Sequence, residues 1–220
     1  IVFLHDEKKK DIGNIMVGFA VLMFGMNTMS GAVKPLAQVP EFTNILLKFS
    51  NPVLGVLAGA LLTAIIQSSS ASVGILQALC VTGAVQYGTA LPIIMGQNIG
   101  TCITAMLSSI GATKNAKRAA VVHLYFNIVG TIAFMGVFYL LNTFLHFSFI
   151  NEVAGPAGIA VIHSAFNIIA TVVLLPFGDV LVKMACATIR DTKEEKAISA
   201  EDQEFMILES RFLSNPGIAI

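Results

Sequence analysis

The feature that most constrains this chain is a segment from Phe49 to Thr113 that contains no Asp, Glu, Lys or Arg. A transmembrane helix needs only ~20 apolar residues to cross the hydrocarbon core of a bilayer, so this segment must hold several membrane-embedded elements. The composition agrees, because 55% of the 220 residues are hydrophobic and only 12% are charged, unlike a typical soluble domain. The sequence therefore predicts an all-α integral membrane protein.

The balance of charge excludes one large class of partners. The 13 Lys and Arg residues are matched by 13 Asp and Glu residues, and they form no concentrated basic patch of the kind that binding to a nucleic acid backbone requires. We therefore expect no nucleic acid partner, and we expect the lipid bilayer to surround most of the chain.

A cluster of hydroxyl and amide groups lies inside the charge-free segment, where the residues from Thr63 to Ser72 read TAIIQSSSAS. Lipid offers no hydrogen-bond partner, so polar groups at this depth are found mainly where they are buried in protein or line a water-filled cavity. The sequence therefore predicts that this cluster binds an ion or a solute.

The apolar run before this cluster is short. As a helix, Val53 to Ile66 extends only ~21 Å, less than the ~30 Å thickness of the hydrocarbon core. This length favours a re-entrant hairpin over about residues 53–86 with the serines at its tip, and Gly55 and Gly59 give its first arm a small-residue face for packing. The alternative is a plain span whose serines bond to carbonyls of their own helix.

A second polar group of residues, GQNIGT at positions 96–101, interrupts the next apolar run, for which we predict a span over about residues 89–112. Gly and Asn are poor residues for a helix interior, and Thr101 is a suitable N-cap for a new half-helix. We therefore predict a broken helix here, with Asn98 beside the gap.

Three further stretches are long and apolar enough to span the membrane, at about 12–33, 119–142 and 153–178. The basic cluster between the apolar segments consists of Lys114, Lys117 and Arg118, and the positive-inside rule assigns it to the cytoplasm. Both the N-terminus and the C-terminal tail are then cytoplasmic. Three full crossings in place of the hairpin and the following span give the same parity, so charge does not decide between them.

The domain organisation follows from these segments. Residues 1–11 read as a solvated linker, and residues 12–189 form the membrane domain. From residue 190 the composition turns polar and charged, with Ser199 as a candidate N-cap of a helix. We predict that residues 190–220 begin a cytoplasmic helical domain.

The last two predicted spans repeat each other. The segments VVHLYFNIVGT and VIHSAFNIIAT align at an offset of 40 residues, which pairs His123 with His163 and Asn127 with Asn167. A histidine in a membrane segment can bind a ligand or relay a proton. Hydrogen bonding between helices is the favoured interpretation of both pairs.

The two polar groups of residues have the chemistry of an ion-binding site. Hydroxyls, amide carbonyls and the freed backbone carbonyls of a broken helix are the oxygen ligands that sodium needs. Half-helices beginning near Ala71 and Thr101 would direct their partly positive N-termini at an anion. No Lys or Arg lies in the predicted spans, so bound cations are the natural counter-charge. These features predict a cation-coupled anion symporter.

Several motifs in order, QSSSAS, GQNIGT, ATKNAKRAA and the two HxxFN elements, resemble the type II sodium-dependent phosphate cotransporter family, and most closely its bacterial branch. The resemblance implies two inverted halves that each carry one QSSS hairpin, followed by a cytoplasmic domain similar to the phosphate-regulatory protein PhoU. This chain has one QSSS motif. It therefore resembles the C-terminal inverted-repeat half and the start of the PhoU-like domain, with the N-terminal half or a second copy as its partner.

The resemblance implies sodium-coupled symport of inorganic phosphate across the cytoplasmic membrane, with sodium as the coupling ion and no other cofactor. The implied phosphate and sodium site consists of Gln67, Ser68, Ser69, Ser70, Asn98 and Thr101. All of these except Ser69 are expected sodium ligands. Cys102 stands where the family has a second threonine, which removes one oxygen ligand, and we leave it out.

Two alternatives remain open. A transporter of the same architecture could carry another small oxyanion or a carboxylate, because hydroxyls and helix dipoles recognise charge and size rather than one identity. An intramembrane serine hydrolase would use a serine of the triplet with His123 or His163 as its base, but the serines lack a Gly-x-Ser-x-Gly elbow. We do not expect an enzyme.

Overall fold

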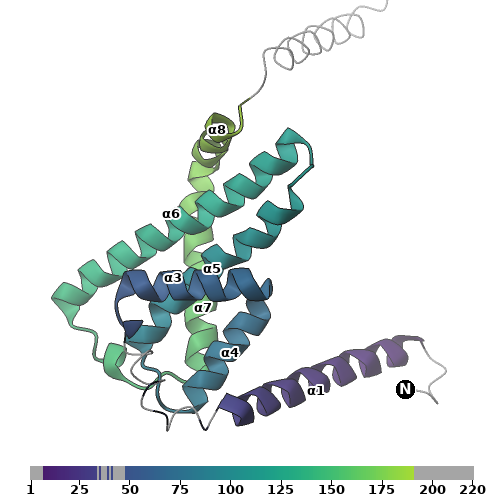
Figure 1. Cartoon of the computed structure of the whole chain (residues 1–220), viewed down its shortest axis with the longest axis vertical. Coiled ribbons are helices and arrows are strands. Elements are labelled where there is room, and N and C mark those ends of the chain that lie inside the picture. Colours follow the sequence, from purple (N-terminus) through teal and green to yellow (C-terminus); the bar gives the residue numbers. More distant parts are fainter. Residues whose placement is uncertain (1–6, 34, 36–38, 40, 42–47, 191–220) are drawn as a thin grey trace, which may run out of the picture.

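The computed structural model describes residues 7–33, 35, 39, 41 and 48–190, and these are almost entirely helical (Figure 1). The helices are α1 (Glu7–Val33), α3 (Pro52–Ile66), α4 (Ser69–Val81), α5 (Tyr87–Ser108), α6 (Lys114–Leu145), α7 (Pro156–Leu174) and α8 (Gly178–Thr188), with 3-10 turns η2 (Ser148–Asn151) and η3 (Leu175–Phe177). Four of the described helical segments, Glu7–Met29, Tyr87–Ser108, Lys114–Leu145 and Pro156–Thr188, are long and apolar enough to cross a membrane. The prediction of an all-α membrane fold is confirmed.

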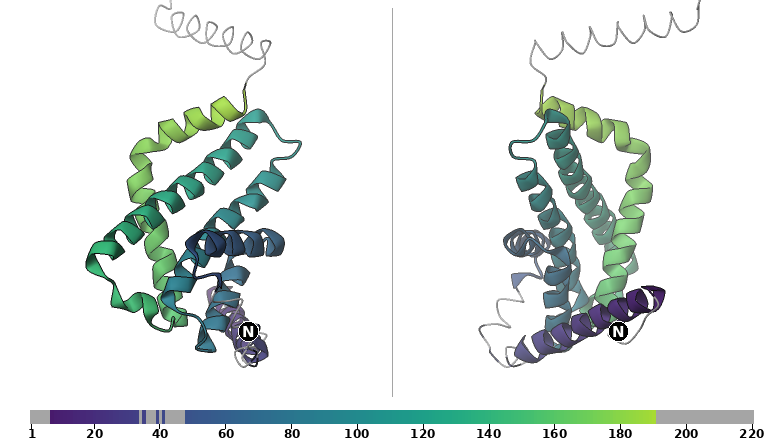
Figure 2. Two further views of the ribbon diagram at one scale, coloured as in Figure 1. Left: turned by 60° about the vertical axis from the view of Figure 1, so that its left-hand side comes forward. Right: turned by 90° about the vertical axis from the view of Figure 1, so that its right-hand side faces the viewer.

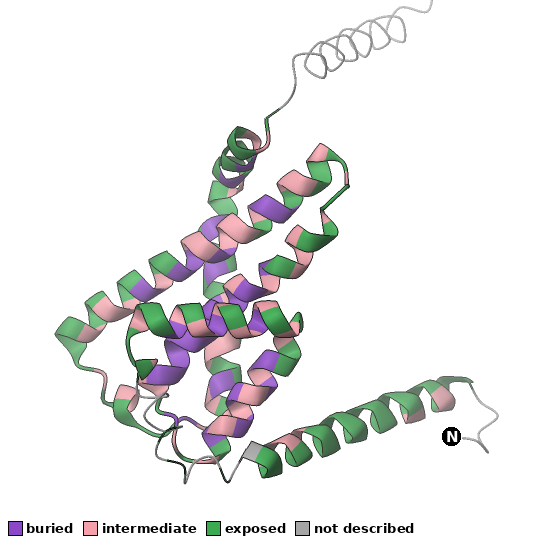
Figure 3. Cartoon of the chain, viewed as in Figure 1, coloured by how far each residue is buried: buried purple, intermediate pink, exposed green. Residues whose placement is uncertain are grey.

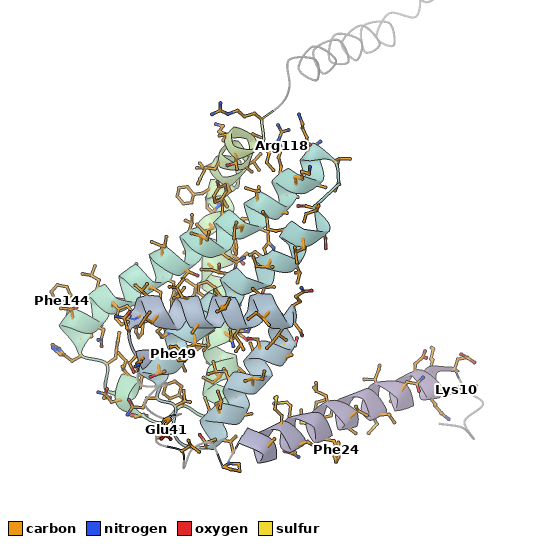
Figure 4. The ribbon with its side chains drawn as sticks, in the orientation of Figure 1. Lys10, Phe24, Glu41, Phe49, Arg118 and Phe144 are labelled. Carbon is orange, nitrogen blue, oxygen red and sulfur yellow. The ribbon has the colours of Figure 1, made fainter. Side chains whose placement is uncertain are left out.

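Helix α5 is the centre of the membrane domain. It contacts α3, α4, α6 and α7, and every residue from Thr89 to Asn98 is buried (Figure 3). By contrast, α1 extends away from the other helices, as the positions of Lys10 and Phe24 show in Figure 4, and it touches the domain mainly along α4. Helix α5 is therefore the support against which α4 and α7, two of the helices that carry the site described below, are packed.

Helix α3 crosses α5 at a set of glycines (Figures 1 and 2). A Cβ atom on Gly59 would collide with the backbone carbonyl of Ile93, and a Cβ atom on Gly96 would collide with the carbonyl of Val56. Only glycine allows the two backbones to approach this closely, which is the usual way in which membrane helices gain packing contacts. The predicted packing face of the first hairpin arm is confirmed at Gly59.

The prediction of a broken helix at positions 96–101 is wrong. Helix α5 runs without interruption from Tyr87 to Ser108. Thr101 does not cap a new helix, because its hydroxyl donates to the carbonyl oxygen of Gln97 at 2.8 Å. The glycines that suggested a break instead admit α3, and the close packing offsets their poor helix propensity of about 1 kcal/mol each.

The first helix begins earlier than predicted. Helix α1 begins at Glu7, inside the stretch predicted as a linker, residues 1–11. Its acidic first residue suits the partly positive start of a helix. Residues 1–6 and the predicted cytoplasmic helical domain from residue 191 onward lie outside the described residues.

The start of α6 and the end of α7 differ from the predicted spans, because a threonine caps the first and a proline follows the second. Helix α6 begins at Lys114 rather than near residue 119, because the hydroxyl of Thr113 accepts a hydrogen bond from the N–H of Ala116 and caps the helix. The last predicted span, residues 153–178, holds α7 and η3. Pro176 lies in this 3-10 turn, and the separate helix α8, which the sequence did not predict, follows.

The basic residues at the start of α6 hold the end of α8. Arg118 donates to the carbonyl oxygen of Ile189 through Nε at 3.0 Å and Nη2 at 2.9 Å, and Lys114 Nζ donates to the carbonyl oxygen of Arg190 at 3.3 Å. Cations are favourable at the partly negative C-terminal end of a helix. The start of α6 and the end of α8 therefore lie at the same end of the molecule, where Figure 4 shows Arg118.

Candidate functional site

The helix break predicted in the QSSS motif is present. Gln67 adopts a left-handed conformation (φ 57°, ψ 22°) and ends α3, with its N–H donating to the carbonyl oxygen of Thr63 at 2.7 Å. The Ser68 hydroxyl then accepts a hydrogen bond from the N–H of Ala71 at 3.3 Å and serves as the N-cap of α4. A new helix N-terminus, with free N–H groups and partial positive charge, thus begins at the serine triplet.

A cavity of about 600 Å³ lies beside this N-terminus, between α1, α4 and α7. Ser69 and Ser70 from the first turn of α4 line it, together with Gln77 from the same helix and His163 from α7. Its remaining walls are apolar or glycine, and they include Leu22 and the other α1 residues Val21, Gly25, Met26 and Met29. The cavity offers hydroxyls, a helix N-terminus and one imidazole to a small solute.

A buried polar network lies directly behind the triplet. Thr63 Oγ1 donates to Ser72 Oγ at 2.7 Å, and Gln97 Nε2 donates to both Ser72 Oγ and the Ser72 carbonyl oxygen at 2.9 Å. All three side chains are buried. This network ties α3 and α4 to α5.

The amide oxygen of Gln97 is the unusual atom of this network. Gln97 is 1% exposed, and its Oε1 accepts no hydrogen bond from the described residues. Leaving a buried acceptor without a donor costs about 1–3 kcal/mol, and a bound cation would satisfy it. Gln97 was not among the predicted site residues, although it lies next to Asn98 in the same polar motif.

Asn98 is held by α7. Its Nδ2 donates to the carbonyl oxygen of Ile94 at 2.9 Å, while its Oδ1 accepts from Asn167 Nδ2 at 3.3 Å and lies 3.3 Å from His163 Nε2. Asn98 is 7% exposed. The amide is therefore fixed in orientation, with its oxygen toward α7.

The predicted site residues fall into two groups. Ser69 and Ser70 line the cavity, and Gln67 and Ser68 form the exposed turn beside it. Asn98 and Thr101 lie on α5, among the residues that pack against α3 and α7. Two links join the groups: the hydrogen bonds between Ser72 and Gln97, and the imidazole of His163, which contacts Asn98 and also lines the cavity.

The HxxFN elements make equivalent bonds on α6 and α7. Asn127 Nδ2 donates to the His123 carbonyl oxygen at 3.0 Å, and Asn167 Nδ2 donates to the His163 carbonyl oxygen at 2.8 Å. Asn127 also bonds across helices, to Cys102 Sγ at 3.3 Å. The predicted role in hydrogen bonding between helices is confirmed for both asparagines and for His163, while the His123 side chain is exposed.

With this geometry established, comparison with known proteins decides the family. The family model described as Na+/Pi-cotransporter matches residues 21–154, more than half of the chain. The chain belongs to the Na+/Pi-cotransporter family. This membership and the four apolar helical segments make it a multi-pass membrane protein, and the resemblance seen in the motifs is confirmed.

Its curated relatives are mostly longer. "Uncharacterized protein YqeW" of Bacillus subtilis is 27% identical over 178 residues, which cover 80% of this chain and 56% of the relative. "Putative inorganic phosphate export protein YjbB" of Escherichia coli is 27% identical over 199 residues, covering 88% and 36%. "Sodium-dependent phosphate transport protein 2A" of Rattus norvegicus is 38% identical over 92 residues, covering 39% and 14%.

The chain thus spans 56% of YqeW and 36% of YjbB. Two of these three relatives have names that describe transport or export rather than catalysis, in agreement with the expectation that the chain is not an enzyme. No solved structure matches the chain.

Proposed function

We propose that the chain forms one half of a sodium-coupled transporter of inorganic phosphate in the cytoplasmic membrane. The observation that carries this proposal is the left-handed break at Gln67, which opens the N-terminus of α4 into the cavity at Ser69 and Ser70. Helix N-termini bind phosphate and other anions through free N–H groups and the helix dipole. Family membership adds phosphate and sodium as the substrates of this site.

In this proposal the hydroxyls of Ser69 and Ser70 donate to phosphate, and side-chain oxygens hold sodium nearby. Gln67, Ser68, Ser70, Asn98 and Thr101 are the proposed sodium ligands, and Gln97 Oε1 joins them because it is a buried acceptor without a donor. Since α5 is unbroken, its backbone carbonyls stay in the helix and do not serve as ligands. Asn98 and Thr101 would exchange their present hydrogen bonds for the ion.

We also propose that α3 and α4 form a re-entrant hairpin. Their lengths of 15 and 13 residues correspond to about 22 and 20 Å, which is short of the ~30 Å hydrocarbon core. Both termini of the chain are then cytoplasmic, the second inverted half or a second copy completes the site, and the residues from 190 onward begin the PhoU-like domain.

The test is phosphate uptake by the full-length transporter in proteoliposomes, with and without an inward sodium gradient, for the wild type and Ser69→Ala. Ser164→Ala, at an exposed serine of α7, is the matched control. We expect sodium-dependent uptake that Ser69→Ala lowers at least about tenfold, as loss of a hydrogen bond to a charged ligand does, while Ser164→Ala transports like the wild type. Uptake that is the same with and without the sodium gradient, or a fully active Ser69→Ala variant, would overturn the proposal.

Competing anions and the direction of transport can be tested in the same assay. Excess sulfate, arsenate or succinate tests the alternative of another oxyanion or a carboxylate, and we expect arsenate alone to compete well because it shares the shape and charge of phosphate. Since YjbB is named as an export protein, vesicles loaded with phosphate and diluted into a phosphate-free medium measure transport in the opposite direction.

A further inference from the structure

Helix α8 begins at the point where the last apolar span is already long enough to cross the bilayer. Helix α7 and the turn η3 hold 19 and 3 residues, which extend over about 34 Å and suffice to cross the ~30 Å hydrocarbon core. Figure 2 shows that α8 then turns away from the direction of α7, and it packs across α6. Helix α8 is therefore not needed as part of the span and lies where the hydrocarbon meets the headgroups.

The two sides of α8 differ in chemistry. Leu181 and Ala185 are buried, and Val180 and Met184 lie beside them but are 51% and 38% exposed. Lys183 stands two residues from both Leu181 and Ala185, which places it on the opposite side of the helix, and it is exposed. A helix with an exposed apolar edge and a cation on its other side is typical of helices that lie in the membrane interface.

The end of the molecule that includes α8 is strongly basic. Within residues 109–145 and 175–190 there is one acidic side chain, Asp179, and the basic side chains are Lys114, Lys117, Arg118, Lys183 and Arg190. The hydrogen bonds from Lys114 and Arg118 to the end of α8 explain those two cations. They do not explain Lys183 and Arg190, which are exposed. Among the described residues, Lys183 forms no ion pair with Asp179 one turn before it.

We propose that α8 and the start of α6 bind anionic phospholipid headgroups, with Lys183 and Arg190 contacting the phosphates. In this arrangement Val180 and Met184 lie against the acyl chains, while the long cationic side chains extend to the headgroups. The inference rests on the proposed orientation, in which this end faces the cytoplasmic leaflet, whose anionic lipids attract Lys and Arg. It does not rest on phosphate transport, because the cavity beside Ser69 is lined from α1, α4 and α7 rather than from α8.

The experiment titrates the detergent-purified full-length transporter with phosphatidylglycerol, which is anionic, or phosphatidylcholine, which has no net charge, and measures bound lipid by native mass spectrometry. It compares the wild type with Lys183→Gln, Arg190→Gln and the double variant. Lys48→Gln is the matched control, because Lys48 is an exposed cation near the start of α5, where Ser50 Oγ lies 3.0 Å from Thr89 Oγ1. A titration repeated in excess inorganic phosphate tests whether the free ion occupies the surface instead.

We expect the wild type to prefer phosphatidylglycerol, and each single variant at Lys183 or Arg190 to bind it about fivefold more weakly, the effect of one cation near an anionic surface. The double variant should lose more than about tenfold in affinity, because the two effects combine. Lys48→Gln and excess phosphate should change little. Thermal midpoints equal to that of the wild type in the absence of added lipid would show that the variants are folded.

Four results would overturn the inference and leave phosphate transport intact: equal binding of the two lipids, an unchanged double variant, an equal loss in Lys48→Gln, or displacement of the lipid by free phosphate. Weak binding by the wild type that Glu194→Gln/Glu195→Gln strengthens would also overturn it, because the acidic residues that follow α8 in the sequence would then occupy the surface. Since the experiment measures bound lipid, a failure of phosphate uptake would not affect its outcome.

Discussion

Two polar motifs interrupt the apolar sequence of this chain, and they behave differently. The QSSS motif at 67–70 ends one helix and begins another, whereas GQNIGT at 96–101 stays inside the continuous helix α5. The first has a residue in the left-handed region, Gln67, followed by a serine that caps the next helix. The second has glycines whose missing Cβ atoms admit the backbone of α3. Glycine in a membrane helix therefore indicates close packing as readily as a break.

The largest expected effect comes from filling the crossing of α3 and α5. Gly96→Val would drive a side chain into the carbonyl of Val56, and we expect it to destabilise the protein by at least about 3 kcal/mol, the upper range for overpacking. The thermal unfolding midpoint of the detergent-purified transporter measures this. Gly136→Val on α6, where a Cβ would meet nothing within 4 Å, is the control and should unfold near the wild type. An unchanged midpoint for Gly96→Val would mean that the glycines do mark a flexible break.

The second prediction concerns the network that links the two motifs. Ser72→Ala removes the acceptor of Thr63 Oγ1 and one acceptor of Gln97 Nε2, and we expect a loss of about 2 kcal/mol, as for buried groups left unpaired. The thermal midpoint should fall, and uptake should fall with it because Gln97 loses its orientation. Thr143→Ala, which removes an exposed bond within α6, should have little effect. A stable and active Ser72→Ala variant would show that transport does not depend on the hydrogen bonds between the two motifs.

The third prediction distinguishes two roles of Ser68, as the N-cap of α4 and as a sodium ligand. Ser68→Ala loses the N-cap of α4 and should cost about 1 kcal/mol, whereas Ser68→Gly should cost only a few tenths. If the hydroxyl binds sodium, both variants should raise the sodium concentration needed for half-maximal uptake. An effect of Ser68→Ala alone would show that the serine acts only as a cap.

The smallest expected effect is at Gln67. A left-handed conformation strains a residue with a Cβ but not glycine. Gln67→Gly should therefore leave the free energy of unfolding unchanged or raise it by less than about 1 kcal/mol, and the thermal midpoint should not fall. Ala58→Gly, inside α3, should instead destabilise the protein by about 1 kcal/mol. Equal destabilisation by the two substitutions would mean that the chain does not turn at Gln67 in the membrane.

The sequence was sufficient where the signals are local. The break between α3 and α4 was predicted from the polar QSSS residues and the short apolar run before them, although the second helix was expected near Ala71 and begins at Ser69. The continuity of α5 could not, because the partners that explain Gly96 and Gly100 are Val56 and Ala60, some forty residues earlier. Gln97 was missed for the same reason, since its acceptor Ser72 lies on another helix.

The cytoplasmic location of the basic residues stays a prediction, and their contacts were not predicted at all. The positive-inside rule uses only the number of cations in a loop. It did not predict that Arg118 binds the carbonyl of Ile189, or that α8 exists as a separate helix for Arg118 to hold. Such contacts depend on the return of the chain to the same end of the molecule, which no local pattern encodes.

The glycine crossing also has a consequence for biogenesis. Helix α3 is synthesised before α5, so its small-residue face emerges from the ribosome without the surface on which it packs. In the proposed re-entrant hairpin, α3 is an arm too short to span the bilayer, and lipid alone cannot hold it. Under this proposal its stable insertion must wait until α5 has been made, which ties the assembly of α3 and α4 to a later stage of translation than their own.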